Sequence, residues 1–189
     1  MKPRSTALAT PAGRAGPLAG TLRAGIAAVL VSAAIGLAGC TPDPAPQPTP
    51  TPLFASEAEA FTAAEQVYRD YTDASNERRD GKADADPQQY LAGAALEDEI
   101  TVQRQLETKK LVVVGSIRVI SFTGTSFERA TSRVSARVCL DVKDARVVDS
   151  SGADVTPSAR QEVGLLEVKF TRSGDGLVIV ESKSLDMKC

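Results

Sequence analysis

Residues 133–143 read RVSARVCLDVK, and this stretch decides the fold class. Apolar side chains at positions 134, 136, 138, 140 and 142 alternate with arginine, serine, cysteine, aspartate and lysine. A period of two places successive side chains on opposite faces of a strand, so the pattern predicts a β-strand with one buried face. A sheet with one buried and one polar face is typical of antiparallel pairing.

The segments on both sides of this strand have the same character. Before it, residues 111–123 (LVVVGSIRVISFT) predict a strand that is interrupted at Gly115. After it, apolar and charged residues alternate over 163–172, and residues 177–184 are again rich in β-branched side chains. The turn residues Ser173-Gly174-Asp175-Gly176 between these two runs predict a tight hairpin.

The part of the chain before the strands has helical periodicity. Ser56, with Glu59 three residues later, matches a capping box, which predicts a helix that runs to about Arg79. Pro87 opens a second helical stretch, predicted as two short helices that end near Thr108. The apolar residues of the first helix recur every three or four positions and predict one buried stripe: Phe61, Ala64, Val67, Tyr68, Tyr71 and Ala74.

Helices that precede a run of strands are typical of the α+β class. Strands joined by short turns pair antiparallel, so we expect N-terminal helices packed on one face of an antiparallel sheet. The sequence shows no internal repeat.

An uncharged segment lies near the N-terminus. Residues 24–39 (AGIAAVLVSAAIGLAG) follow Arg23 and end in small residues, an order typical of a secretory signal. Sixteen helical residues measure about 24 Å, which is shorter than the roughly 30 Å hydrocarbon core of a bilayer. A permanent membrane span is therefore not expected from this segment.

The segment ends at Leu37-Ala38-Gly39-Cys40, which resembles a bacterial lipobox. The resemblance implies a lipoprotein precursor: residues 1–39 are the signal peptide, cleavage falls between Gly39 and Cys40, and Cys40 carries a diacylglycerol, usually with a further acyl chain such as palmitate. Two or more acyl chains give stable membrane anchoring. We therefore expect a protein anchored on the extracytoplasmic face of the cell membrane, in a bacterial cell envelope. The alternative is an ordinary export signal followed by an unrelated cysteine.

A proline-rich segment follows Cys40. Residues 41–52 (TPDPAPQPTPTP) have proline at every second position, which predicts extended polyproline II conformation. At about 3.1 Å per residue it reaches roughly 37 Å. We therefore divide the mature chain into a lipidated tether over 40–53 and a folded domain over 54–189. A ligand for a proline-binding module is the alternative role of this segment.

The composition excludes several kinds of chemistry. The 189 residues include three cysteines and no histidine, which excludes Ser-His-Asp and Cys-His catalysis and His-ligated zinc. All charges in residues 1–39 are basic, whereas the remainder carries 18 bases against 24 acids, so nucleic acid is not an expected partner. No phosphate loop or dinucleotide fingerprint is present, and we expect no cofactor, no metal and no assignable catalytic residue.

The order of elements resembles the nuclear transport factor 2-like superfamily, a cone-shaped α+β fold in which helices cover a strongly bent antiparallel sheet. The resemblance covers about residues 56–189, and Val67–Asn76 (VYRDYTDASN) looks like the end of the family's first helix. It implies that Gly115 lies at a strand bend. It also implies a homodimer, because members of the superfamily often pair through the sheet face. A cystatin-like variant or a small open sheet with helices is the competing arrangement.

Two cysteines remain besides Cys40. Cys139 lies in the central predicted strand, and Cys189 is the last residue. An even number of cysteines outside the cytoplasm predicts a disulfide, which would join the end of the chain to the sheet. Two unpaired thiols are the alternative.

Tyr68 and Tyr71 on the first helix are candidate pocket residues. In the ketosteroid-isomerase-like enzymes of the superfamily, a tyrosine near this place donates a hydrogen bond to a developing oxyanion, and the resemblance implies Tyr71 for that role. Residues 94–98 (AALED) resemble the segment that supplies the carboxylate base, which implies Asp98. The competing interpretation makes both tyrosines core aromatics and Asp98 part of a solvated helix face.

The leading hypothesis is a membrane-anchored, non-catalytic envelope domain that binds a small apolar ligand, a peptide or another envelope protein. One alternative is an isomerase- or cyclase-like enzyme that uses Tyr71 and Asp98 in an apolar pocket. The other is a structural envelope component without a ligand.

Overall fold

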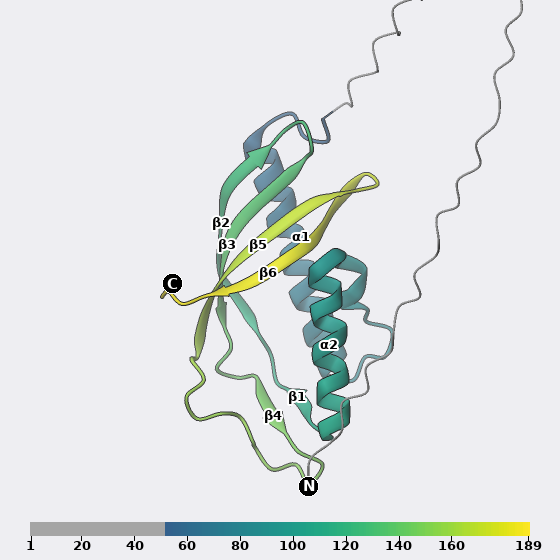
Figure 1. Ribbon diagram of the computed structural model, residues 1–189, viewed down its shortest axis with the longest axis vertical. Helices are drawn as coiled ribbons and strands as arrows, with labels where there is room; N and C mark the ends of the chain where they lie inside the picture. Colours follow the sequence, from purple (N-terminus) through teal and green to yellow (C-terminus); the bar gives the residue numbers. More distant parts are fainter. Residues whose placement is uncertain (1–51) are drawn as a thin grey trace, which may run out of the picture. The chain divides into compact units, whose positions relative to one another are not determined.

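The computed structural model describes residues 52–189 (Figure 1). The predicted signal peptide over 1–39, the lipidation site Cys40 and the tether up to residue 51 lie outside the described residues. No helix among the described residues is long and apolar enough to cross a membrane. In chain order the elements are α1 (Glu57–Arg79), the 3₁₀ helix η1 (Pro87–Tyr90), α2 (Gly93–Lys109), β1 (Val112–Val114), β2 (Arg118–Glu128), β3 (Arg133–Asp141), β4 (Arg146–Val148), β5 (Val163–Ser173) and β6 (Gly176–Leu185).

α1 begins and ends where the sequence predicts. The hydroxyl oxygen of Ser56 accepts a hydrogen bond from the backbone N–H of Glu59 at 3.1 Å. The Glu59 carboxylate in turn accepts one from the N–H of Ala55 at 2.8 Å, so donors at the helix start are satisfied from both directions. The buried residues of the helix recur every four positions and are Ala60, Ala64, Tyr68 and Thr72. Of the predicted stripe, Ala64 and Tyr68 are buried, Phe61, Val67 and Tyr71 are partly buried, and Ala74 is not among the core residues.

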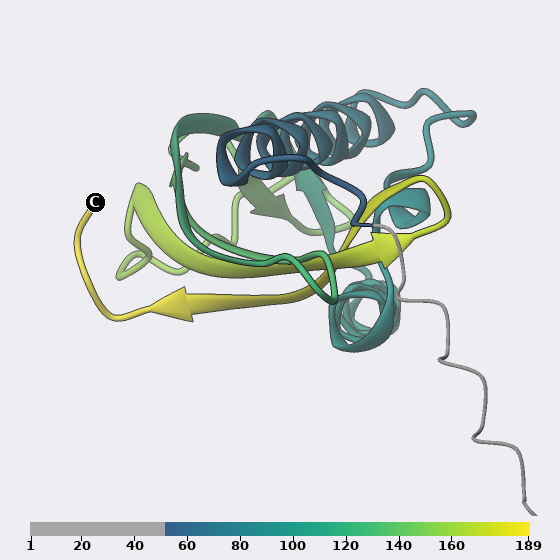
Figure 2. The ribbon, with the colours of Figure 1, turned by 90° about the horizontal axis from the view of Figure 1, so that it is seen from above.

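Four strands form the main sheet in the order β2-β3-β5-β6, and every pair is antiparallel. α1 lies across one face of this sheet, which bends around it (Figure 2). The alternation predicted for β3 is confirmed, because Val134, Ala136 and Val138 are at most 1% exposed. On the opposite face Lys169 and Glu181 form an ion pair at 3.0 Å, which keeps that face polar. The domain is therefore α+β, with helices packed against a bent antiparallel sheet, as the sequence predicts.

The single interrupted strand predicted over 111–123 is two strands in different sheets. β1 pairs with β4, a strand that the sequence did not predict, whereas β2 belongs to the main sheet. Gly115 lies between them with a φ of 79°, and a Cβ there would overlap the carbonyl oxygen of Asp144. Glycine adopts this positive φ without strain and has no Cβ to meet the Asp144 carbonyl. The change of sheet therefore depends on a close backbone approach between segments that are distant in the sequence.

Side chains at the end of α1 hold this break in place. Asn76 Nδ2 donates to the carbonyl oxygen of Ile117, and its Oδ1 accepts from the N–H of the same residue, both at 2.9 Å. Arg79 Nε donates to the carbonyl oxygen of Gly115 at 3.0 Å. These bonds satisfy backbone groups that the break removes from a strand ladder. The end of α1 and residues 115–117 consequently form one hydrogen-bonded unit.

The second helical stretch is a 3₁₀ turn followed by one helix of 17 residues, not two short helices. Leu91, between the two, forms a parallel bridge with Ile179, and the N–H of Ala92 donates to the carbonyl oxygen of Ile179 at 2.8 Å. These bonds start α2 at the β6 edge of the sheet and not on the face that α1 covers (Figures 1 and 2). Because the helix lies at an edge, Ala95 is its one fully buried residue.

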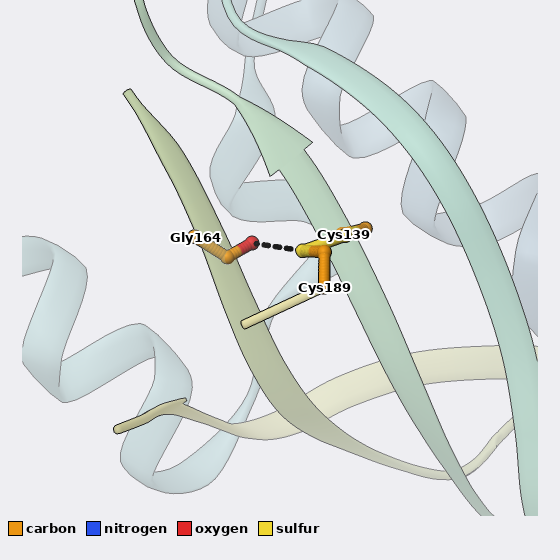
Figure 3. Close-up of a disulfide and its surroundings, with 3 residues drawn as sticks. All are labelled: Cys139, Gly164 and Cys189. Carbon is orange, nitrogen blue, oxygen red and sulfur yellow. Dashed lines mark hydrogen bonds between the residues drawn. A yellow bond between two sulfur atoms is a disulfide. The ribbon is translucent and has the colours of Figure 1, made fainter. Parts of the chain in front are cut away.

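The structure joins Cys139 to Cys189, the predicted pair, with their Cα atoms 5.8 Å apart (Figure 3). Cys139 belongs to the polar side of β3, yet it is only 4% exposed because the end of the chain crosses it. The Sγ atom of Cys189 lies 3.5 Å from the carbonyl oxygen of Gly164 in β5. The disulfide therefore fastens the C-terminus across two neighbouring strands.

Candidate functional site

Two hollows adjoin at the C-terminal half of α1, and both are lined by Tyr71, Ser75, Arg79 and Ile117. The inner hollow lies between α1 and the main sheet and measures about 160 Å³. The outer one, which we call the groove, lies between α1, α2 and β1 and measures about 490 Å³. Pockets for small ligands usually have volumes of about 300–1,000 Å³. The groove has the size for a ligand, and the inner hollow extends it.

Tyr68 and Tyr71 line the inner hollow, with their ring centroids 6.0 Å apart. Tyr68 is 3% exposed, and burial raises its pKa well above the ordinary value of 10.0. Burial also raises the pKa of Tyr71 to about 12, with the charge of Glu99 as the second cause. Both hydroxyls therefore stay protonated at neutral pH and can donate hydrogen bonds. The structure thus brings together two of the three predicted pocket residues.

The groove has apolar walls on two sides. α2 contributes Val102 and Leu106, while Leu111, Val112 and Val113 form the opposite wall. Two of these side chains are unusually open to solvent, since Val102 is 51% exposed and Val112 is 57% exposed. Exposed apolar side chains that gather around a concave surface are typical of a binding site.

Arg79 and Glu99 are the charged groups of the groove that act on the Tyr71 hydroxyl. Burial lowers the pKa of the Arg79 guanidinium, and the neighbouring Tyr71 and Glu99 act against this shift. The Glu99 carboxylate accepts a hydrogen bond from Gln103 Nε2 at 3.1 Å, and the amide oxygen of Gln103 accepts one from Gln88 Nε2 at 3.1 Å. Arg79 and Glu99 therefore place opposite charges beside Tyr71 in a groove whose other charged lining residues are Arg78 and Glu107.

Asp98 does not line either hollow with the tyrosines. It is exposed on α2, and its charge acts on Lys183 of β6. Successive residues of a helix point about 100° apart, so Glu99, the next residue, faces the groove in its place. Tyr68 and Tyr71 therefore line one hollow without Asp98, and the carboxylate that acts on Tyr71 is that of Glu99.

The polar groups that line the groove are the hydroxyls of Tyr71 and Ser75, the Gln103 amide, two guanidinium groups and two carboxylates. An isomerase-like reaction would need a substrate held between Tyr71 as the hydrogen-bond donor and Glu99 as the base. Binding of an apolar molecule needs only the walls that are already present. Within residues 52–189, no group of three or more Cys, Asp or Glu side chains is arranged to hold a metal ion.

A third hollow, comparable in size to the groove, lies on another side of α1 and is mostly polar. It measures about 470 Å³, and most of its lining is polar, with an ion pair of 2.6 Å between Lys82 and Glu77 at its border. Its acidic lining residues are Asp70, Asp73, Glu77, Asp84 and Asp86. It lacks the continuous apolar wall that a ligand site needs.

The sequence did not predict the groove, although one local signal was present. Residues 112–114 are three consecutive valines, which have no polar face, unlike the alternating pattern of β3 and β5. A strand that is apolar on both faces needs a cover on both sides or leaves one side open. In this fold α2 stands beyond that open side without closing it, and only the tertiary structure shows this.

No protein-family model matches the sequence, and no curated protein matches it. The crystal structure of the intermembrane space region of the chloroplast protein ARC6 aligns with a TM-score of 0.46 and 16% identity, over 66% of this chain and 95% of that one. A polyketide cyclase-like protein from Xanthomonas campestris pv. campestris aligns with a TM-score of 0.34 and 14% identity, over 66% of this chain and 90% of that one. At these values neither likeness bears on function, and the α+β architecture stands on the elements and strand pairing described above.

Proposed function

We propose that the protein is a lipid-anchored envelope lipoprotein whose folded domain binds an apolar ligand or a segment of another envelope protein in the groove, without transforming it. The lipobox at Leu37–Cys40 and the proline-rich tether support the anchor. The groove supports the binding role. In this proposal the tether holds the domain near the membrane surface, and the groove faces partners in the envelope.

The observation that carries the binding role is the exposed apolar wall around a hollow of about 490 Å³. Removing apolar surface from water stabilises a complex by about 25 cal/mol for each Å². Val102 and Val112 are already more than half exposed in the free protein, so a ligand can cover them without a rearrangement of the core. The polar groups around Tyr71 would orient the ligand, as a few convergent polar groups do in most pockets.

A charge placed in the wall tests this proposal. Val102→Arg puts a cation into the groove at a position where the side chain is already exposed, so the fold should tolerate it. Thr101→Arg is the matched control, because Thr101 is exposed on the same helix but lies outside the groove. The uncharged apolar dye N-phenyl-1-naphthylamine serves as the probe, and its fluorescence reports the binding.

We expect the purified protein and Thr101→Arg to bind the dye alike, and Val102→Arg to bind it at least about tenfold more weakly. Circular dichroism melting curves of all three proteins show whether they remain folded. If both variants bound the dye equally, the groove would not be the binding site, and the proposal would be contradicted.

The anchor has a separate test in the bacterial cell. Labelled palmitate should be incorporated into the protein, and the Cys40→Ser variant should lose both the label and the membrane association. A Cys40→Ser protein that stays in the membrane fraction would contradict the lipoprotein proposal.

A further inference from the structure

The free edge of β1 faces the groove, and its central residue has backbone groups available there. In the β1–β4 pair Val113 lies opposite Val147, whose backbone N–H and carbonyl point away from β1. Hydrogen-bonded and non-hydrogen-bonded pairs alternate in an antiparallel ladder, so Val112 and Val114 are the residues that exchange hydrogen bonds with β4. The Val147 N–H donates to Thr156 Oγ1 at 2.8 Å, and its carbonyl oxygen accepts from the Val155 N–H at 2.9 Å. The N–H and carbonyl of Val113 therefore point away from β4, toward α2 and the groove.

The residues on either side of Val113 along this edge are already engaged. The N–H of Leu111 donates to the carbonyl oxygen of Leu106 at 2.8 Å, and the carbonyl oxygen of Gly115 accepts from Arg79 Nε at 3.0 Å. Over residues 52–189, no hydrogen bond satisfies the N–H or the carbonyl of Val113. The edge of β1 thus offers the Val113 N–H as a donor and the Val113 carbonyl as an acceptor, between the hydrogen-bonded groups of Leu111 and Gly115.

The edges of the main sheet are protected in ways that this edge is not. β2 is interrupted by two irregularities, between Val119 and Ser121 and between Gly124 and Ser126, which are typical of an edge that avoids further pairing. The other edge, β6, is covered at Ile179 by Leu91 and Ala92. The short edge of β1 lies instead in an apolar groove of about 490 Å³.

The side chains around Val113 differ along the strand, with a cation at one end and apolar groups at the middle. Arg79 caps the Gly115 end, and within the described residues its Nη1 makes no hydrogen bond, whereas the Glu99 carboxylate of the groove already accepts one from Gln103. Val102, Leu106 and Val112 form apolar walls at the middle. A carboxylate at the Gly115 end and branched apolar side chains at the middle would complement this arrangement.

We propose that the groove binds an extended peptide of a partner protein, which adds to β1 as an antiparallel strand at Val113 and places an acidic residue beside Arg79. This inference rests on the proposed function, since it names the occupant of the same groove. Main-chain hydrogen bonds to Val113 give the pairing, and alternate side chains of the peptide enter the groove, as in other cases of strand addition.

The probe is a capped peptide of eight residues in which the first is aspartate and valine and threonine alternate in the rest. Two further peptides carry N-methyl groups, one on its four odd-numbered amides and the other on its four even-numbered amides. Only one edge of an added strand faces Val113, so only one of these two peptides loses the required donor. Binding to the purified protein is measured by displacement of the dye and by the amide exchange rate of Val113.

We expect the parent peptide to displace the dye and to slow exchange at the Val113 amide. One N-methylated peptide should bind within about threefold of the parent, and the other should bind at least about tenfold more weakly, because a lost backbone hydrogen bond leaves its partner unsatisfied. Replacing the aspartate by lysine should weaken binding, since Arg79 would then face a like charge.

Variants of the protein provide the reciprocal test. The N–H that Val113→Pro removes is one that β4 does not use, so β1 keeps its ladder. Val113→Ala is the matched control that keeps the N–H. Both variants lose the valine side chain from the wall, so their difference reports the N–H alone. We expect the proline variant to bind the peptide at least about tenfold more weakly than the alanine variant, with melting curves showing both to be folded.

The outcomes separate this inference from the proposed function. Equal binding of the two N-methylated peptides would overturn strand addition and leave the groove as an apolar site. Strand addition would also be overturned if no peptide bound while the dye still bound and Val102→Arg abolished dye binding. If neither peptide nor dye binds the groove, both the inference and the proposed function fail.

Discussion

Asn76→Ala removes the side chain that joins the end of α1 to the break between β1 and β2. In the protein this amide donates to the carbonyl oxygen of Ile117 and accepts from its N–H, each at 2.9 Å and partly buried. It also accepts a hydrogen bond from Arg79. Alanine at this position leaves two backbone groups of Ile117 without partners, next to the groove.

The magnitude follows from the two bonds that are lost. A typical hydrogen bond contributes about 0.5–1.5 kcal/mol net, and a buried partner left unsatisfied costs about 1–3 kcal/mol. Water can reach these partly buried groups, so we expect Asn76→Ala to lower the free energy of unfolding by about 2–4 kcal/mol. For a domain of this size that corresponds to roughly 3–4 °C in melting temperature for each kcal/mol.

Urea unfolding measures this loss, and two variants serve as references. Asn76→Asp keeps an acceptor for Ile117 N–H and Arg79 but loses the donor, so its loss should be intermediate. Gln66→Ala removes an exposed bond to Asp70 on the same helix and should cost less than about 0.5 kcal/mol. If Asn76→Ala cost no more than Gln66→Ala, the clamp between α1 and Ile117 would not contribute to stability, and the reasoning would be refuted.

Three further changes test other parts of the structure. Gly124→Ala should lower the free energy of unfolding by about 1–3 kcal/mol because its Cβ would overlap the Phe61 ring, and the loss should shrink in a Phe61→Leu background; equal losses in both backgrounds would exclude this contact. Cys189→Ser should cost about 2–4 kcal/mol in denaturant unfolding through the lost loop closure, without weakening dye binding in the groove; unchanged stability would show that the disulfide is dispensable. Tyr71→Phe should leave dye affinity within about threefold. In the wild type, the pKa of Tyr71 rises from 10.0 to about 12 on folding, so the unfolded chain releases this proton first and stability should fall as the pH rises from 10 to 12. The slope of stability against pH in this window should be shallower for Tyr71→Phe, and identical slopes would contradict the raised pKa.

Much of the secondary structure could be predicted because it depends on neighbours in the sequence. Ser56 and Glu59 lie within one turn, and their hydrogen bonds start α1 at the predicted position. The alternation over 133–143 depends only on the two-residue repeat of a strand, and β3 has the predicted buried face. The turn at residues 173–176 joins β5 to β6 as expected.

The site was predicted only in part, because it depends on angles and on distant segments. Tyr68 and Tyr71 come together since they lie on one helix at a spacing of three. Asp98 and Glu99 are neighbours in the sequence, but only the position of α2 at the β6 edge decides which of them faces the groove. Nothing in the local sequence could distinguish the two.

The sequence by itself determined the class of fold, the start of α1 and the buried face of β3, because periodicity and capping are local properties. The anchor at Cys40 stays a prediction from the sequence. The tertiary structure decided where the chain changes sheets and what remains open afterwards. The backbone approach of Gly115 to Asp144, and the hydrogen bonds of Asn76 to Ile117 across 41 positions, separate β1 from β2. That separation leaves the free edge at Val113 beside α2, and contacts across such distances have no signature in a single local pattern.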